Sequence, residues 1–115
     1  MQKYYYSIKV TRVVDGDTYD CMVDLGFNTW VTCRVRMYGI NAPETRTRDL
    51  KEKEAGLKAK KWLIERVDKG EKVEMLSYGK GKYGRTLGEL YIDGVNVNKE
   101  MVRKKLCKSY SGGKR

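Results

Sequence analysis

The feature that most constrains this chain is a repeated alternation of apolar and polar residues with a period of two. The alternation covers Tyr6–Thr11, Thr18–Leu25 and Trp30–Tyr38. Successive side chains of a β-strand point to opposite faces of a sheet, so each run predicts a strand with one buried face. Turn-forming residues, Asp15-Gly16 and Gly26, separate the runs. The first third of the chain therefore predicts three consecutive antiparallel strands.

After Pro43 the period of the apolar residues changes from two to about four. Between Lys51 and Val67 the apolar residues recur at every fourth position, as Ala55, Ala59, Leu63 and Val67. The remaining positions are mostly Lys and Glu, which suit a solvated surface. This pattern predicts an amphipathic helix with one apolar stripe.

The last third of the chain predicts two further strands, at Glu71–Ser77 and Arg85–Ile92, and then a second helix. Asn96 or Asn98 could cap that helix. Its inward-facing residues are expected to be Met101, Val102 and Leu106.

The predicted order is three strands, a helix, two strands and a helix. This is the order of a five-stranded Greek-key barrel of the OB type, in the mainly β or α+β class, and other small α+β folds share it. A length of 115 residues allows one domain. We assign residues 1–110 to that domain and residues 111–115 to a flexible basic tail.

The chain is strongly basic, with 25 Lys and Arg against 15 Asp and Glu and a net charge of +10. A basic surface raises the local concentration of ligands that carry phosphate, so the charge favours a polyanion such as a nucleic acid as partner. The alternative is a basic surface that serves solubility alone.

The cysteines and the N-terminus indicate a reducing, cytoplasmic or otherwise intracellular setting. Three cysteines are an odd number without zinc-like spacing, and Cys21 and Cys33 fall on apolar strand positions, as small core residues do. The first ten residues lack the apolar run of a secretory signal, and no stretch could span a membrane.

Two short segments carry carboxylates that could do chemistry. In the Asp-Gly-Asp turn, Asp17 offers an oxygen ligand of the kind that calcium prefers, although such a turn by itself is often only structural. In the second segment, Arg36 is expected to project from the sheet, and Asn41 and Glu44 flank the only proline. Pro43 restricts the backbone there and holds Glu44 in a definite place. The alternative is a plain connection in which Glu44 favours the start of the following helix.

A third segment, Tyr78–Arg85, is rich in glycine and positive charge. Lys82 and Arg85 could bind phosphate, and Tyr83 offers a ring on which a base or sugar can stack. A basic hairpin loop without a ligand is the alternative reading.

Together the three segments supply what phosphodiester hydrolysis needs. A carboxylate could hold a metal, a second carboxylate could act as general base in a chain without histidine, and two arginines could bind the phosphate through paired hydrogen bonds. The metal and the guanidinium groups would stabilise charge on the phosphate oxygens.

These segments resemble the signature segments of the staphylococcal nuclease (thermonuclease) family in order and spacing. The resemblance covers roughly Val10 to Lys108. It is carried by Val13–Thr18, Arg36, Asn41–Thr45, Lys82–Arg85 and Asp93–Asn98.

The resemblance implies roles for individual residues. Arg36 and Arg85 match the arginines that bind phosphate and stabilise the transition state, and Glu44 matches the general base. Lys82 and Tyr83 match residues that contact the terminal phosphate and sugar of a bound nucleotide.

The resemblance also implies a calcium site formed by Asp17, Asn41 and the backbone carbonyl of Ala42. Asn41 stands where the best-studied members have a second aspartate. One negative charge is therefore missing, and we expect weaker calcium binding than in those members. The chain also stops soon after its second helix, whereas the secreted members continue into a third.

The implied activity is that of a monomeric, calcium-dependent nuclease that cleaves DNA and RNA, preferably single-stranded, with little sequence preference and leaves 3′-phosphates. The rival hypothesis is a non-catalytic OB module that only binds nucleic acid, and a third is a basic scaffold protein. The presence of Arg36, Glu44 and Arg85 together favours the enzyme, because a binding module would not require all three.

Overall fold

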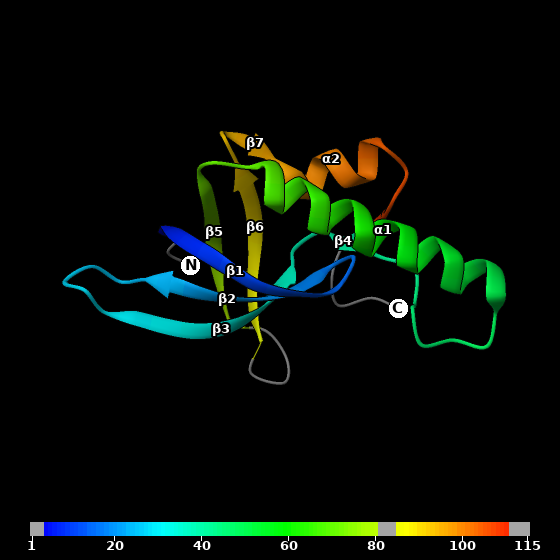
Figure 1. Cartoon of the computed structure of the whole chain (residues 1–115), viewed down its shortest axis with the longest axis horizontal. Coiled ribbons are helices and arrows are strands. Elements are labelled where there is room, and N and C mark those ends of the chain that lie inside the picture. Colours follow the sequence, from blue (N-terminus) through cyan, green and yellow to red (C-terminus); the bar gives the residue numbers. More distant parts are fainter. Residues whose placement is uncertain (1–3, 81–84, 111–115) are drawn as a thin grey trace.

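The computed structural model describes residues 4–80 and 85–110, in which five long strands form a barrel (Figure 1). The barrel strands are β1 (Tyr4–Asp15), β2 (Thr18–Asp24), β3 (Trp30–Met37), β5 (Val73–Lys80) and β6 (Thr86–Ile92). Neighbouring strands pair antiparallel in the order β3-β2-β1-β5-β6, and a parallel pairing of β3 with β6 closes the ring. This confirms the expected five-stranded OB-type barrel. The expected tail at residues 111–115 lies outside the described part of the chain.

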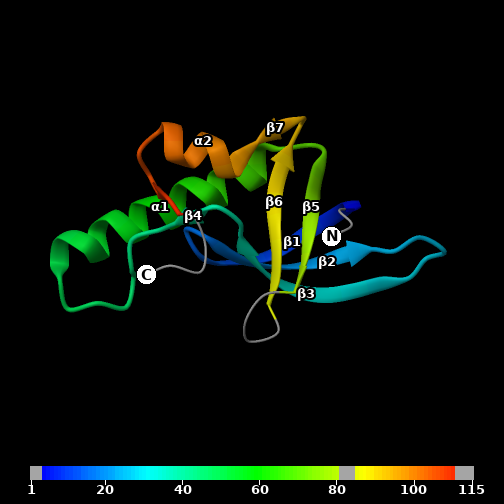
Figure 2. The same cartoon turned by 180° about the vertical axis from the view of Figure 1, so that it is seen from behind.

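Two helices and three short strands complete the described structure. Helix α1 (Leu50–Lys69) lies between the third and fourth barrel strands in the chain, and α2 (Val97–Arg103) follows the barrel (Figure 2). The two-residue strands are β4 (Ile40–Asn41), β7 (Val95–Asn96) and β8 (Lys108–Ser109). Neither helix is long and apolar enough to cross a membrane.

Strand β1 is longer than the alternation predicted, and its inward face changes along its length. Ile8 and Val13 are both buried although an even number of residues lies between them. The pairing of β1 with β2 shifts register between Val10 and Arg12, as at a β-bulge. A bulge adds one residue to a strand and so reverses which side chains face the core, which the simple alternation could not reveal.

Asp49 is the N-cap of helix α1, and its side chain accepts hydrogen bonds from the N–H groups of Lys51 and Glu52. Its buried residues are Gly56, Ala59 and Leu63. The prediction that Ala55 belongs to the buried stripe is wrong, because Ala55 is exposed. At 3.6 residues per turn, steps of four drift by about 40° each around a helix. Ala55 therefore lies about 80° around the helix from Leu63, whereas Gly56, seven residues before Leu63, lies about 20° from it and is the buried residue there.

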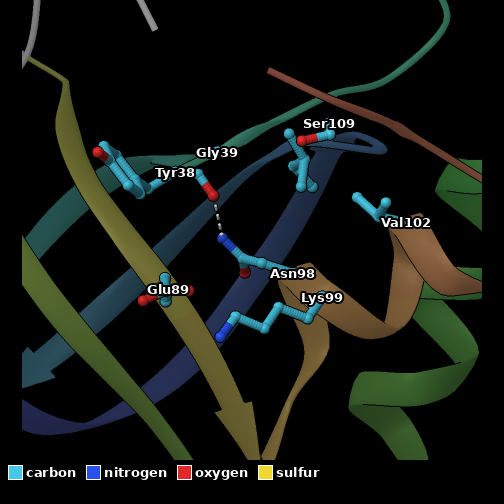
Figure 3. Close-up of a pocket in the computed structure, with 8 residues that line it drawn as sticks. Tyr38, Gly39, Glu89, Asn98, Lys99, Val102 and Ser109 are labelled. Atoms are coloured by element: carbon cyan, nitrogen blue, oxygen red, sulfur yellow. Dashed lines mark hydrogen bonds between the residues drawn. The ribbon is translucent and has the colours of Figure 1, made fainter. Parts of the chain in front are cut away.

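The two asparagines near α2 have different functions. Asn96 is the N-cap, and its side chain accepts a hydrogen bond from the N–H of Lys99 at 3.1 Å. Asn98 is buried inside the helix, where its Oδ1 accepts from the N–H of Leu90 at 2.9 Å and its Nδ2 donates to the carbonyl of Tyr38 at 2.8 Å (Figure 3). Asn98 thereby ties α2 to β6 and to the end of β3.

The inward residues expected for this helix are mostly confirmed. Met101 is buried, Val102 is half-buried against the core, and Leu106 packs against the core from a position beyond the end of α2.

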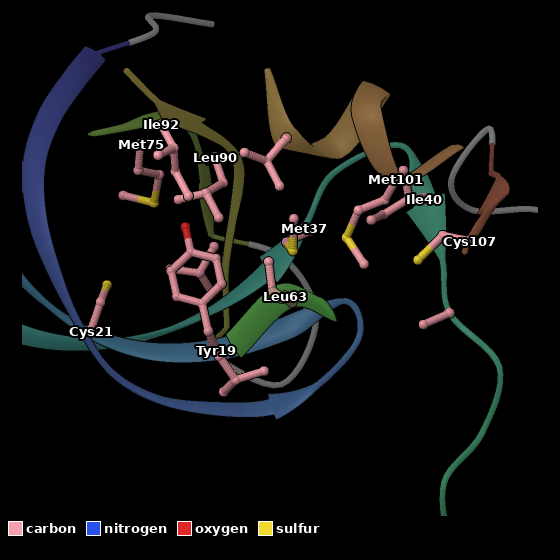
Figure 4. Close-up of a cluster of buried hydrophobic side chains, with 14 of the residues drawn as sticks. Tyr19, Cys21, Met37, Ile40, Leu63, Met75, Leu90, Ile92, Met101 and Cys107 are labelled. Atoms are coloured by element: carbon pink, nitrogen blue, oxygen red, sulfur yellow. The ribbon is translucent and has the colours of Figure 1, made fainter. Parts of the chain in front are cut away.

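Large side chains from the barrel strands and α1 fill the barrel interior (Figure 4). The largest of those that are fully buried are Tyr19, Met37, Leu63, Met75 and Leu90. The hydroxyl of Tyr19 has no hydrogen-bond partner among the described residues, and burial raises the pKa of Tyr19 well above its ordinary value.

The cysteines belong to this interior, as expected. Cys21 is fully buried, and Cys33 packs against the core from the neighbouring strand. Both are free thiols. Burial raises the pKa of Cys21 to about 12, so its thiol is protonated at neutral pH and unsuited to bind a metal.

Candidate active site

Asp17 is the buried acidic residue of the turn that joins β1 and β2. Its Oδ2 accepts a hydrogen bond from the backbone N–H of Ala42 at 2.8 Å, and its Oδ1 accepts one from the hydroxyl of Thr18 at 3.0 Å. The first bond joins segments 25 residues apart. It fixes the turn against the loop that carries Pro43.

Arg36 lies directly across from this turn. Its register partner on β2 is Thr18, and the N–H of Met37 donates to the carbonyl of Asp17 at 2.7 Å. The Nη1 atom of Arg36 lies 3.5 Å from Oδ2 of Asp17, and its Nη2 donates to Oδ1 of Asn41 at 3.2 Å. The structure thus brings Asp17, Arg36, Asn41 and Ala42 together, with the guanidinium between the acidic and the amide side chain.

The orientation of Arg36 agrees with the sequence analysis. Val35 and Met37 on either side of it are buried in the core, while the Arg36 side chain keeps 16% of its surface exposed. Protein groups therefore hold the guanidinium in place, and a small part of the side chain reaches solvent.

Two glycines let α1 and the site loops come closer together than larger residues would permit. A Cβ at Gly16 would lie 2.8 Å from Cβ of Ala59 and 3.0 Å from Cβ of Ala42. A Cβ at Gly56 would lie 2.7 Å from the carbonyl oxygen of Pro43. Neither contact follows from the periodicity of the sequence. Gly56 did give a signal, because glycine inside a helix costs about 1 kcal/mol relative to alanine and so points to a packing requirement.

Glu44 lies in the loop between β4 and α1, and its side chain is exposed. Its backbone N–H donates to Oε2 of Glu52 at 3.0 Å. The hydroxyl of the next residue, Thr45, donates to Oδ1 of Asp15 at 2.8 Å. The loop backbone at Glu44 is therefore attached to α1, and the neighbouring Thr45 attaches it to the end of β1, at the same end of the barrel as Asp17.

Arg85 immediately precedes β6 and is half-buried. The parallel pairing sets Thr86 opposite Val35 and Leu87 opposite Arg36. Arg85 therefore lies just before the start of the strand that pairs with the Arg36 segment. The predicted nucleotide-binding residues Lys82 and Tyr83 lie outside the described residues.

The donor atoms near Arg36 suit a hard cation. Asp17 carries a carboxylate, Asn41 an amide oxygen and Ala42 a backbone carbonyl, which are the ligand types that calcium uses. The Asp17 oxygens accept hydrogen bonds already, but a carboxylate has about four acceptor positions and so retains capacity. Residues 4–80 and 85–110 contain no group of three or more Asp, Glu, Cys or His side chains that could together hold a metal ion. The set therefore fits calcium by ligand type but is low in charge, and its two side-chain oxygens also contact the Arg36 guanidinium.

A model of the family described as staphylococcal nuclease homologues matches residues 34–114, a segment that contains Arg36, Glu44 and Arg85. The chain belongs to the staphylococcal nuclease family. This confirms the resemblance found in the sequence, and the closed barrel with two helices agrees with the family's fold.

Two curated proteins are similar to the chain. An uncharacterized endonuclease of Haemophilus influenzae is 32% identical over 102 residues, which are 89% of this chain and 51% of that protein. A probable staphylococcal-like nuclease of Oryza sativa subsp. japonica is 35% identical over 71 residues, which are 62% of this chain and 19% of that protein. The chain thus spans about half the length of the first relative and about a fifth of the second.

Proposed function

We propose that the chain is a calcium-dependent nuclease that hydrolyses phosphodiester bonds of DNA and RNA, with a preference for single strands and little preference for sequence. The observation that carries the proposal is the position of Arg36. Its guanidinium is held by Asp17 and Asn41 and stays partly exposed, beside the strand that Arg85 precedes. Family membership and the relative named as an endonuclease support the same activity.

In this proposal Arg36 and Arg85 bind the phosphate that is attacked. Arginine keeps its charge at every relevant pH and can donate two parallel hydrogen bonds to phosphate oxygens. Asp17 and Asn41 fix the direction of the Arg36 guanidinium before substrate arrives. Such preorganisation stabilises the charge that develops on the phosphate oxygens without a further cost of reorientation.

Glu44 is the proposed general base. Its carboxylate takes a proton from a water molecule, the water oxygen forms a bond to phosphorus, and the bond from phosphorus to the 5′ oxygen breaks. The 5′ oxygen leaves with a proton from solvent, and the other product carries a 3′-phosphate. The exposure of Glu44 and the double attachment of its loop suit this role, because a base must be both reachable by water and well placed.

Asp17, Asn41 and the carbonyl of Ala42 are the groups that would hold calcium. The bound ion would supply positive charge next to the phosphate. Because the set contains one carboxylate, we expect half-saturation at a higher calcium concentration than a site with two would need.

The test is cleavage of denatured DNA by the wild type, with calcium and with a chelator, compared with Glu44→Gln. Loss of a general base typically lowers kcat by two orders of magnitude or more. In the presence of calcium we therefore expect the kcat of Glu44→Gln to be at least roughly 100-fold below that of the wild type. In chelator we expect neither protein to cleave. Glu54→Gln, an exposed residue of α1, is the matched control and is expected to retain wild-type activity.

Chelator-insensitive cleavage by the wild type would remove calcium from the proposal. Absent cleavage together with tight binding of the same DNA would contradict the nuclease activity itself. It would favour the alternative of an OB module that only binds nucleic acid. Wild-type activity in Glu44→Gln would remove Glu44 from the mechanism.

A further inference from the structure

Two stacked tyrosines lie on the outer surface beside the candidate active site. The ring centroids of Tyr38 and Tyr78 are 4.4 Å apart, with an angle of 23° between the ring planes. The hydroxyl of Tyr78 donates a hydrogen bond to Glu89, which raises the pKa of Tyr78, and Glu89 also accepts one from Nδ2 of Asn96 at 2.8 Å. Tyr78 is thus held in place and supports one face of Tyr38, while 45% of Tyr38 stays exposed.

Tyr38 also lines an open cavity of about 280 Å³ between the end of β3, β6 and α2 (Figure 3). Tyr38 and Glu89 contribute to the barrel side of the cavity, and Lys99 and Val102 contribute from α2. Ligand pockets generally begin at roughly 300 Å³. A cavity of this size suits one planar ring system rather than a large ligand, and the exposed Lys99 adds positive charge at its border.

The cavity lies close to Arg36 along the sheet. Tyr38 is two residues beyond Arg36, and its N–H donates to the carbonyl of Gly88 at 2.8 Å. On the neighbouring strand, Glu89 is likewise two residues beyond Leu87, the partner of Arg36. Two residues of a strand span about 7 Å. A nucleotide whose phosphate contacts Arg36 therefore has its own or its neighbour's base within reach of Tyr38.

We propose that this cavity is a nucleobase subsite in which Tyr38 stacks on a base next to the phosphate held by Arg36. The subsite rests on the proposed nuclease function and names a further binding residue for it. Stacking accepts any base, because every base has an aromatic face, so the subsite adds affinity for unpaired nucleotides without sequence preference. Bases in a duplex are stacked on each other and cannot occupy it, which gives a physical basis for a preference for single strands.

The test compares two short oligonucleotides of equal charge, oligothymidylate and the same backbone without bases. Binding is measured by fluorescence anisotropy in chelator, where cleavage does not interfere. One stacked base contributes a factor of roughly 5 to 150 in affinity. We expect wild type to bind oligothymidylate more tightly by a factor in this range, Tyr38→Ala to lose most of that difference, and Tyr38→Phe to retain it because the ring remains.

Phe27→Ala is the matched control, because Phe27 is a fully exposed aromatic residue at the distant tip of the β2–β3 hairpin. It is expected to bind both oligonucleotides as the wild type does. Equal losses in Tyr38→Ala and Phe27→Ala, or an unchanged base dependence in Tyr38→Ala, would overturn the subsite while leaving the nuclease proposal intact. Failure of wild type to bind oligothymidylate more tightly than the backbone without bases would also overturn the subsite, and cleavage of denatured DNA in calcium decides the nuclease proposal independently. The abasic comparison on wild type needs no variant, so a folding defect cannot obscure it.

Discussion

The interior of the barrel and the end of the barrel that carries Asp17 differ in the size of the groups that pack together. The interior is filled by large side chains such as Tyr19, Leu63 and Leu90. At the Asp17 end, Gly16 meets the methyl groups of two alanines, and Gly56 of α1 meets the backbone of the Pro43 loop. The contacts there involve small side chains and backbone, with partly buried polar groups between them.

Because of this difference, we expect the two regions to contribute differently to stability and to ligand binding. In the interior the free energy of folding comes from apolar surface removed from water, and a residue can be exchanged for another of similar volume. At the Asp17 end, hydrogen bonds such as that from Ala42 to Asp17 depend on how closely the backbones approach. We therefore expect substitutions in the interior to change the free energy of unfolding alone, and substitutions at the Asp17 end to change ligand binding as well.

The largest expected effect is that of Leu63→Ala in the interior. Truncation of a fully buried leucine generally costs about 2–5 kcal/mol, a large part of the 5–15 kcal/mol typical of a small domain. We expect a loss of this size in urea unfolding and unchanged calcium and DNA binding by the folded fraction. Ile64→Ala, at an exposed neighbouring position, is expected to cost much less. Similar losses in both variants would mean that the barrel interior is not the main source of stability.

Gly16→Ala tests the close packing at the Asp17 end. The new methyl group would lie 2.8 Å from Cβ of Ala59, too close for a real contact. Overpacking of this kind costs about 1–3 kcal/mol, and we also expect weaker calcium binding because the Asp17 turn must move. Ala59→Gly removes the opposing methyl group and is expected to recover part of the loss in a double-mutant cycle. Strict additivity of the two substitutions would show that the contact does not limit the packing.

Asn41→Asp is expected to change the metal site more than the fold. An aspartate keeps an acceptor for Arg36 and adds one negative charge beside Asp17. Because calcium affinity rises with the number of charged ligands, the half-saturating calcium concentration is expected to fall several-fold. Melting temperature followed over a calcium titration measures this, since a ligand that binds the folded state stabilises it. Asn28→Asp at the exposed hairpin tip adds the same charge far away and is expected to leave the midpoint unchanged. An unchanged midpoint in Asn41→Asp would remove Asn41 from the calcium site.

The smallest expected effect is that of Tyr19→Phe. The Tyr19 hydroxyl is buried without a hydrogen-bond partner among the residues that the structure describes. Its removal relieves a desolvation cost of about 1–3 kcal/mol, which is partly offset by the lost contacts of the oxygen atom. We expect the free energy of unfolding to stay equal or to rise by up to about 1 kcal/mol in chemical denaturation. A clear loss of stability would show that the hydroxyl is satisfied, for example by water.

The sequence alone determined the features that depend on neighbouring residues. A period of two predicted the barrel strands and placed Arg36 on the outer face, because successive side chains of a strand alternate by geometry. A period near four predicted α1 after Pro43, and the turn-forming residues marked the separation of the first three strands. Residue chemistry already pointed to Asp17, Glu44 and Arg85, and the family resemblance assigned roles to these residues and to Asn41 and Ala42, since it rests on short segments at fixed spacings.

Only the tertiary structure decided how these segments meet. The parallel pairing of β3 with β6, the Asn41 contact to Arg36 and the linking role of Asn98 join residues whose relation no local pattern encodes. The same holds for Gly16 against Ala59, and for the stacking of Tyr38 on Tyr78. Periodicity reports which side of its own element a residue occupies. Contact between elements depends on the packing of the whole barrel, in which the shape of every side chain contributes.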